Sequence, residues 1–546
     1  MKFRADEGEA TPPRMRVHGR SPHPAEYAAW REMRRNTRQV EEPGADAAWN
    51  HLISVFVHGK AGAGLVATLE SLRSQTYRNI EIIVGGPQTA ELPPRDDFAS
   101  LRGMFPEPEA DPLTLLADPA SDRLWRGSHI MFAQAGTLFD DEAFELLNAL
   151  LNQGSAESRP DLVLCDHDRL GPGGAAVPHF LPGWDPDLVC AMDVVGTAFL
   201  VSRRLLQARR SGTAPGSLRE WLIGVAQAPR APHWAHLAEP AIQLPDPPAK
   251  PDRTTPAIIG RAASVAIVIP NRNRAEMLGR CVQFIGSFAG GVELVIVDHA
   301  STEPATLDLY QSLRRDLGAR IVPVAGMFNF SRMVNLGVAA TSSEMVLLLN
   351  NDVEVTRPGQ IETLVGHAMR PEVGVAGARL LYPDGTVQHA GMMLECQSSP
   401  TRIVPHHVGR GAPESSDGYL HGLRTVRNYQ AVTGALLATR RAVFDAVNGF
   451  DEVSLPVEYN DVDFCLKVRQ QGLRVVTVPT EGIVHRESAT RDTTPTPDVL
   501  TMRNAAEAVI SSRWPEAVRH DPFRHPWVKI ESVPQPRFAW HEGPAP

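Results

Sequence analysis

The sequence predicts an α/β protein in which one mainly parallel sheet, with helices on both faces, occurs twice. Apolar runs of strand length alternate with helical spacings of apolar residues, and this alternation is typical of such a sheet. The pattern repeats at a constant offset, because Val57 lies as far from Ile269 as Glu81 lies from Glu293. The chain has 546 residues, which is more than one hydrophobic core usually serves. Duplication of one domain explains all three observations.

Composition excludes several classes of protein. The chain is 43% hydrophobic and 21% charged, which are ordinary values for a folded globular protein. The formal net charge is −9, and no long basic run is present. A partner that presents a phosphate backbone is therefore not expected, and we predict no nucleic-acid binding.

Five widely spaced cysteines without a CxxC pair argue against a disulfide framework and favour a reducing compartment. Residues 1–16 lack the apolar core of a secretory signal, and no apolar run is long enough to cross a bilayer. We therefore predict a cytoplasmic protein without a transmembrane segment. Peripheral attachment to the inner face of the cell membrane is the alternative to a free protein.

The expected elements of the first half are a buried strand at 53–57, a helix with one apolar face and a strand at 81–84. The helix carries Leu65, Leu69 and Leu72 at helical spacing. Before them, residues 1–50 form a partly ordered lead-in with one short helix near 27–35, whose Tyr27 and Trp30 are expected to dock on the domain after it.

The second half repeats this order with strands at 265–269 and 293–297 on either side of a helix that contains Leu278 and Cys281. A proline-rich stretch separates the halves and is typical of a stiff linker. The predicted boundaries are 1–50 for the lead-in, 51–245 for the first copy, 246–262 for the linker, 263–492 for the second copy and 493–546 for a C-terminal extension.

Polar clusters follow three strands of the second half, at 270–274, 298–301 and 350–354. Parallel α/β sheets bind ligands beyond the carboxyl ends of their strands, so these clusters are candidate ligand contacts. Asp352 is a suitable oxygen ligand for Mg²⁺ or Mn²⁺ on a diphosphate. For any single cluster, turn formation by Asn and Asp is the more economical explanation.

A helix is expected to begin near Asn460 and to end at Gly472. Asp461 and Asp463 lie in its first turn, where a carboxylate serves either as a stabilising cap or as a general base facing a cleft. His485 follows another apolar segment, and by itself such a histidine is more often structural than a ligand.

In order, VAIVIPNRNR, ELVIVDHAST, MFNFSRMVNLGVAA, VLLLNNDVEV, DGTVQHAG, VTGALLATRRAVFDAVNGFDE, NDVDFCLK and VHRES resemble a family 2 glycosyltransferase of the GT-A fold. The resemblance covers about residues 263–492. Residues 51–245 resemble the same fold, as in bacterial tandem-domain members that build surface polysaccharides. Two tandem GT-A domains are therefore expected, with a Rossmann-like, mainly parallel sheet in each.

The resemblance implies roles for eight residues. A nucleotide sugar would be bound by residues of three loops, namely Pro270, Asn271, Arg272, Asp298, Asn350 and Asp352. Asp352 and His485 would be ligands of Mn²⁺ or Mg²⁺. Asp461 matches the catalytic carboxylate of the family. Asn350 and Asn460 depart from the family pattern, in which acids precede both aspartates.

The activity implied is inverting transfer of a sugar from a UDP-, dTDP- or GDP-sugar to a glycan or a lipid-linked glycan. Asp461 would act as the base, and the divalent metal would stabilise the departing diphosphate. The alternatives are a non-catalytic glycan or nucleotide-sugar scaffold and a bifunctional polysaccharide polymerase. A nucleotidyltransferase would need a glycine-rich basic loop near its first strand, and the candidate at 60–64 lies in the copy that lacks the acids.

The first copy is expected to keep the fold without the chemistry. Gly86, Gln134 and Gly136 stand where Asp298, Asn350 and Asp352 stand in the second copy, and no aspartate precedes Glu220 near the position of the base. The segment Cys165-Asp-His-Asp offers metal-ligand side chains but has no obvious partner cluster. A polar loop after a strand is the preferred interpretation of that segment.

Overall fold

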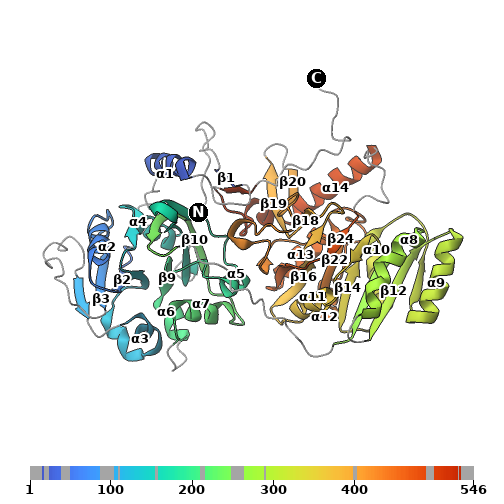
Figure 1. The fold of residues 1–546 in the computed structure, drawn as a ribbon, viewed down its shortest axis with the longest axis horizontal. Coiled ribbons are helices and arrows are strands. Elements are labelled where there is room, and N and C mark those ends of the chain that lie inside the picture. Colours follow the sequence, from blue (N-terminus) through green and yellow to red (C-terminus); the bar gives the residue numbers. More distant parts are fainter. Residues whose placement is uncertain are drawn as a thin grey trace, which may run out of the picture. The chain divides into compact units, whose positions relative to one another are not determined.

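The computed structural model describes residues 15–17, 24–37, 50–85, 104–107, 111–153, 158–209, 215–247, 263–287, 291–397, 402–486, 497–526 and 528–530. The chain divides into two compact units. Unit 1 contains residues 1–252 together with 525–529, and unit 2 contains 253–524 and 530–546. Both units are α/β, as predicted (Figure 1).

Unit 1 is built around a nine-stranded sheet with the order β4-β3-β2-β5-β9-β7-β10-β6, to which β8 adds beside β7. Its strands are β2 (Ile53–His58), β3 (Ile80–Gly85), β4 (Met104–Glu107), β5 (His129–Gln134), β6 (Leu138–Phe139), β7 (Leu162–Leu170), β8 (Ala176–His179), β9 (Phe199–Ser202) and β10 (Trp234–Leu244). Its helices are α1 (Pro24–Thr37), α2 (Ala63–Arg73), α3 (Pro112–Ala117), α4 (Ala143–Leu151), α5 (Pro186–Ala191), α6 (Arg203–Ala208) and α7 (Leu218–Ala226).

Unit 2 is built around an eight-stranded sheet with the order β13-β12-β11-β14-β22-β16-β23-β21. These strands are β11 (Val265–Asn271), β12 (Val292–His299), β13 (Arg320–Val324), β14 (Met345–Leu349), β16 (Val373–Ala378), β21 (Arg427–Asn428), β22 (Leu436–Arg440) and β23 (Arg474–Val478). A smaller sheet has the order β15-β24-β17-β18, formed by β15 (Val353–Val355), β24 (Ile483–His485), β17 (Leu380–Leu381) and β18 (Val387–His389). A hairpin pairs β19 (Met392–Gln397) with β20 (Arg402–His407).

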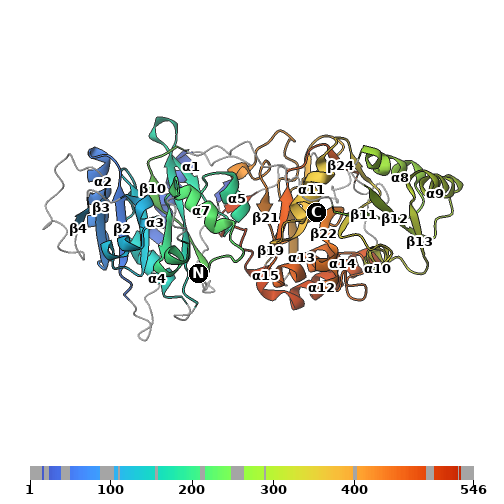
Figure 2. The same cartoon turned by 90° about the horizontal axis from the view of Figure 1, so that it is seen from below.

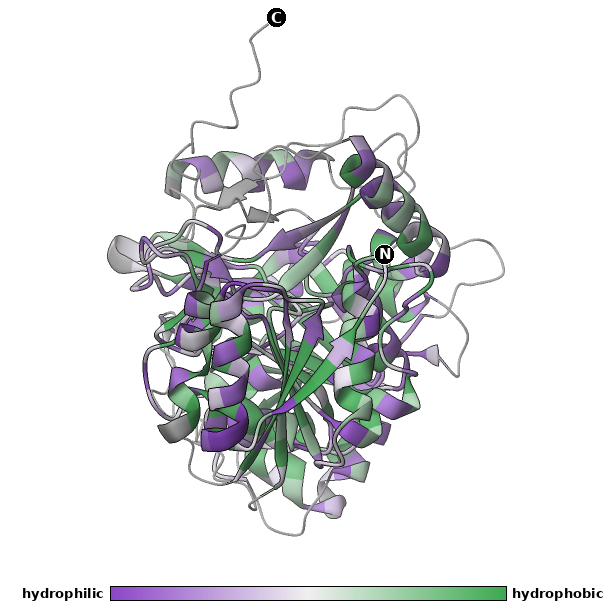
Figure 3. Ribbon diagram, turned by 90° about the vertical axis from the view of Figure 1, so that its right-hand side faces the viewer, coloured by the Kyte–Doolittle hydropathy of each residue, from purple (hydrophilic) through white to green (hydrophobic). Residues whose placement is uncertain are grey.

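The helices of unit 2 cover both faces of its main sheet (Figure 2). Apolar side chains of α8 (Ala275–Val282), α9 (Pro304–Leu317) and α11 (Gln360–Ala368) share one core cluster with one face of the sheet. The opposite face packs against α10 (Phe330–Ala339), α12 (Arg441–Ala446), α13 (Asn460–Gln470), α14 (Pro497–Arg513) and α15 (Pro515–Arg519). Figure 3 shows this distribution, with hydrophobic strands between helices that carry hydrophilic residues.

Seven neighbouring strands of the two main sheets, β4 to β10 and β13 to β23 in sheet order, share one topology. In unit 1, β2 is parallel to β3 and β5, whereas β9 is antiparallel to both β5 and β7. In unit 2, β11 is parallel to β12 and β14, whereas β22 is antiparallel to both β14 and β16. The same parallel pairing then joins β7 to β10 and β16 to β23. The prediction of one α/β fold in two copies is therefore confirmed, and each main sheet combines parallel with antiparallel strand pairs.

The predicted lead-in helix is present as α1, which belongs to unit 1. Tyr27 and Trp30 are buried, and both rings make edge contacts with Phe180. These aromatic contacts pack α1 against the rest of unit 1, as the sequence predicted.

The interpretation of residues 165–168 as a loop is wrong. Strand β7 continues through these residues to Leu170, and Asp166, His167 and Asp168 are buried in it. The continued pairing with β8 and β10 explains the difference, because a strand between two neighbours keeps its polar side chains out of water when each finds a partner.

Among the residues that the structure describes, no helix is both long enough and apolar enough to cross a bilayer.

Candidate functional site

Three parallel strands of unit 2 end at one edge of the main sheet, and the predicted nucleotide-sugar-binding residues lie at or just after these ends. The pairing of β11 with β12 sets Asn271 opposite Asp298. Strand β14 runs parallel to β11 on its other side, and Asn350 follows its last residue. Parallel strands present their carboxyl ends together, so the three polar clusters meet at this edge.

The side chain of Asp298 is fixed at the end of β12. One of its carboxylate oxygens accepts a hydrogen bond from the hydroxyl of Tyr310 (2.9 Å) and another from the hydroxyl of Ser301. Asn271 is buried and donates to the Tyr310 oxygen (2.7 Å), while Asn351 donates to the Asn271 carbonyl oxygen (2.6 Å). This network joins all three strand ends.

The loop after β11 has an unusual backbone. Asn273 and Arg274 both have positive φ, near 56° and 63°, and the Asn273 side-chain oxygen accepts from the backbone of Thr302. Pro270 is buried at the end of β11, whereas Arg272 is exposed. The loop therefore leaves the Arg272 guanidinium available to an anionic ligand.

Asp352 and His485 are brought together by the pairing of β15 with β24, although they are far apart in the sequence. The His485 Nε2 atom lies 3.2 Å from Asp352 Oδ1. Both side chains are about nine-tenths buried. Among the described residues, no group donates a hydrogen bond to Asp352 Oδ1 or to the buried Asn350 Oδ1. Unpaired acceptors in this position are suited to a bound cation.

Gln388 determines which nitrogen of His485 carries a proton. Its side-chain nitrogen donates to the His485 carbonyl oxygen (3.3 Å), so its own carbonyl oxygen faces His485 Nδ1 at 2.7 Å. With the Gln388 oxygen as its partner, Nδ1 is the nitrogen that donates, and Nε2 is left to face Asp352. An imidazole nitrogen and a carboxylate oxygen fit Mn²⁺ or another divalent ion.

Asp461 lies in the first turn of α13 and is held by backbone groups. Gly434 N–H donates to Oδ2 and Val462 N–H donates to Oδ1, each at 2.8 Å. Burial raises the pKa of Asp461 above its ordinary value, while these two hydrogen bonds act in the opposite direction. Each carboxylate oxygen keeps a further lone pair for a substrate hydroxyl.

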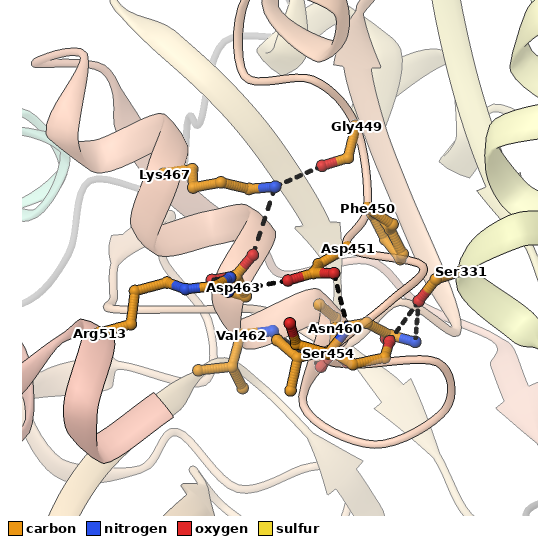
Figure 4. Close-up of polar contacts among 12 residues, drawn as sticks. Ser331, Gly449, Phe450, Asp451, Ser454, Asn460, Val462, Asp463, Lys467 and Arg513 are labelled. Atoms are coloured by element: carbon orange, nitrogen blue, oxygen red, sulfur yellow. Dashed lines mark hydrogen bonds and ion pairs between the residues drawn. The ribbon is translucent and has the colours of Figure 1, made fainter. Parts of the chain in front are cut away.

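The neighbouring polar residues of α13 are occupied by structural contacts (Figure 4). Asp463 Oδ1 accepts hydrogen bonds from Arg513 (2.8 Å) and Trp514 (2.9 Å), and Lys467 lies 3.3 Å from its other oxygen. Asn460 is buried and donates to the Ser331 hydroxyl (3.0 Å). Asp461 is therefore the carboxylate of this turn that remains suited to act as a base.

One short segment before β22 connects the candidate base with the candidate metal ligands. Gly434 N–H binds Asp461, and the carbonyl of the next residue, Ala435, accepts from Asn350 N–H at 2.9 Å. Thr433 N–H donates to the buried His389, the residue that follows Gln388. The structure thus brings Asn350, Asp352, His485 and Asp461 around one strand end.

Strand register clarifies the comparison with the first copy. His58 pairs with Gln134 in unit 1, and continuing the β11–β14 register by two residues sets Pro270 opposite Asn350. Gln134 and Gly136 therefore occupy the positions of Asn350 and Asp352. Arg219 is the second residue of α7, and Asp461 is the second residue of α13, so these two positions correspond. Likewise, Leu244 is the last residue of β10 and His485 is the last residue of β24. Gly86 lies outside the described residues.

Sequence reasoning missed residues that act through tertiary contacts. Tyr310 and Ser301 bind Asp298, and Gln388 binds His485, but no local pattern marks any of them as a partner. The segment that contains Gln388 is recognisable in the sequence, whereas its pairing with a residue 97 positions away is not.

Parts of this chain are similar to known proteins. Residues 266–412 match the model of glycosyl transferase family 2. The chain is 29% identical over 535 residues to the uncharacterized protein y4gI of Sinorhizobium fredii (strain NBRC 101917 / NGR234). This match covers 88% of this chain and 58% of that protein. It is also 29% identical over 531 residues to the O-antigen biosynthesis protein RfbC of Myxococcus xanthus. That match covers 86% of this chain and 40% of RfbC.

The chain thus spans less than two thirds of the length of these curated relatives. Among solved structures, the mannosyltransferase PcManGT from Pyrobaculum calidifontis, in complex with GDP-Man and Mn²⁺, is 18% identical. The match covers 50% of this chain and 76% of that one, with a TM-score of 0.33. The second half of this chain, over residues 266–412, therefore contains a domain that matches glycosyl transferase family 2.

Proposed function

We propose that unit 2 transfers a sugar from a nucleotide-sugar donor to a glycan or lipid-linked glycan, with inversion at the anomeric carbon. Surface polysaccharide synthesis is the expected setting, which the similarity to an O-antigen biosynthesis protein supports. The observation that carries the proposal is the convergence of Asp461 with Asn350, Asp352 and His485 around the segment before β22.

The donor nucleotide would bind across the ends of β11 and β12. Asp298, held by Tyr310 and Ser301, presents a carboxylate suited to accept hydrogen bonds from a base or ribose. The exposed Arg272 supplies a positive charge to the diphosphate. Asp352 and His485, with Asn350 beside them, would hold a divalent cation, which when bound neutralises charge on the departing diphosphate.

Asp461 would take the proton of the acceptor hydroxyl. The acceptor oxygen forms a bond to the anomeric carbon while the bond from that carbon to the diphosphate oxygen breaks, so the electron pair leaves with the nucleoside diphosphate. Burial raises the pKa of Asp461, which makes its carboxylate a stronger base than an exposed aspartate.

The test is to incubate the purified chain with a panel of UDP-, dTDP- and GDP-sugars and Mn²⁺, and to measure nucleotide release with glycan acceptors. Asp461→Asn should lower turnover on the order of 10² to 10⁴ while the donor still binds. Asp445→Asn, an exposed aspartate on α12, is the matched control and should leave turnover unchanged.

Asp352→Ala should abolish metal-dependent release. Wild-type turnover in Asp461→Asn would contradict the assignment of the base. Release from no donor with any acceptor would instead favour the scaffold alternative.

A further inference from the structure

Unit 1 contains a convergent cluster of metal-ligand side chains that has no counterpart among the glycosyltransferase motifs. Asp166 lies on β7, His236 lies on the neighbouring strand β10, and His525 lies in the C-terminal segment 525–529 of the same unit. The register pairs His236 with Leu164, two residues before Asp166. Because side chains alternate along a strand, His236 and Asp166 project from the same face of the sheet.

The ligand atoms of the three side chains lie close together. His236 Nε2 lies 2.8 Å from Asp166 Oδ1, and His525 Nε2 lies 2.5 Å from Asp166 Oδ2. One ligand atom from each residue fits within 4.8 Å of the other two. The imidazoles pack edge to face with their ring centroids 5.5 Å apart, and Phe180 packs against His525. The cluster is therefore held in place by its surroundings.

Burial removes the Asp166 carboxylate from water, so its negative charge needs a partner inside the protein. Its side chain is fully buried, and those of His525 and His236 are 5% and 13% exposed. Among the described residues, no lysine or arginine forms an ion pair with Asp166, and apart from the imidazoles its hydrogen-bond donor is Leu181 N–H (2.8 Å). Buried carboxylates in proteins are either paired with positive charge or bound to metal ions.

From this arrangement, we propose that Asp166, His236 and His525 form a zinc site in unit 1, with three protein ligands and a fourth position left for a water molecule. Two imidazole nitrogens and one carboxylate oxygen are a ligand set that Zn²⁺ prefers, whereas Mg²⁺ and Ca²⁺ prefer oxygen alone. The ion would link β7, β10 and the segment 525–529. Gln134 ends β5, which is separated from β7 by β9, so these three ligands do not replace the residues missing from the strand ends of the first copy.

The experiment is a measurement of zinc content in the full chain by mass spectrometry, after loading with Zn²⁺ and dialysis. All proteins carry Asp352→Ala, which removes a ligand of the expected second metal site. We expect about one equivalent of zinc in this background and none after adding either His236→Ala or Asp166→Asn. His233→Ala is the matched control, because His233 is exposed and lies three residues from His236. It should keep the zinc.

A second measurement separates loss of the site from loss of the fold. Replacing zinc with Co²⁺ should give a visible absorption spectrum in the Asp352→Ala protein that disappears with Asp166→Asn, while circular dichroism stays unchanged. Zinc retained by both site variants, or no zinc bound in the Asp352→Ala background, would overturn the proposal. The latter result would mean that the three side chains form only a hydrogen-bonded network.

Discussion

At the scale of single residues, the candidate metal ligand His485 depends on Gln388, which sets the orientation of its ring. His485 offers Nε2 towards Asp352 because Gln388 accepts a hydrogen bond from Nδ1. Without that acceptor, the proton is free to sit on either nitrogen and the ring is free to turn. Substitution of a residue that orients a metal-binding histidine commonly lowers the affinity for the metal by about 10- to 100-fold.

Gln388→Ala should weaken Mn²⁺ binding by about 10- to 100-fold, because it releases the tautomer and the orientation of His485. The measurement is an Mn²⁺ titration followed by electron paramagnetic resonance, which does not depend on turnover. Gln311→Ala, at an exposed glutamine on α9, is the control and should bind Mn²⁺ as the wild type does. Equal affinities in the two variants would show that Gln388 does not position the ligand.

At the scale of elements, α10 supports the strands whose ends form the site. Gly337 faces the sheet so closely that an added Cβ would lie 2.3 Å from a methyl group of Val268 and 2.7 Å from one of Val297. The two valines belong to β11 and β12, the strands that end in Asn271 and His299. This glycine is therefore explained by close packing of a helix on a sheet.

Gly337→Ala should lower the free energy of unfolding by about 1–3 kcal/mol, because the buried valines have little space to move. Gly279→Ala is the matched control, since Gly279 lies inside α8 and a Cβ there would meet nothing within 4 Å. That variant should gain about 0.5–1 kcal/mol from the better helix propensity of alanine. Urea unfolding of both variants measures the difference, and equal stabilities would refute the packing argument.

The segment after α15 contains a buried carboxyl group, that of Asp521, which bonds to the backbone of β19 and of its own segment. Asp521 accepts hydrogen bonds from Leu394 N–H (2.7 Å) and Phe523 N–H (2.8 Å). Burial raises the pKa of Asp521 to about 6, although these hydrogen bonds and the charges of Arg469 and Arg524 oppose the shift. The folded protein therefore binds this proton more tightly than the unfolded chain does.

Stability should consequently fall as the pH rises from about 4, the pKa of an unperturbed aspartate, to about 6. The contribution of Asp521 is at most about 3 kcal/mol. Asp521→Asn, which cannot titrate, should flatten this part of the stability profile, and thermal melting between pH 4 and 7 measures the change. Asp308→Asn, at an exposed residue of α9, should leave the profile as it is in the wild type.

At the scale of the whole molecule, one fold occurs twice, but the predicted donor ligands occur once. Seven strands of the two main sheets match in order, yet Gln134, Gly136, Arg219 and Leu244 replace the residues that unit 2 has at equivalent places. None of these four side chains supplies a carboxylate or an imidazole. A nucleotide sugar and its metal are therefore expected to bind to unit 2 alone.

This expectation is tested by equivalent substitutions in the two units of the full chain. Asn350→Ala should lower nucleotide release, because it removes an unpaired acceptor beside Asp352. Gln134→Ala changes the equivalent position of unit 1 and should leave release unchanged. A loss of release in Gln134→Ala that matches the loss in Asn350→Ala would indicate that the first copy also binds the donor.

The sequence by itself determined the α/β class, the duplication and the strand ends that carry the candidate site. These features follow from hydrophobic periodicity and from polar residues at the ends of buried runs, which are local properties of the chain. The helix that begins at Asn460 and the docking of Tyr27 and Trp30 were predictable for the same reason.

Only the tertiary structure decided which polar residues meet. Gln388 on β18 contacts His485 on β24, with β17 between these strands in the sheet, and Asp461 is held by the backbone of Gly434. The imidazole partners of Asp166 lie 70 and 359 residues away, so no local pattern predicts them. Contacts between distant segments depend on how strands pair and helices pack, and residue spacing along one chain does not encode them locally.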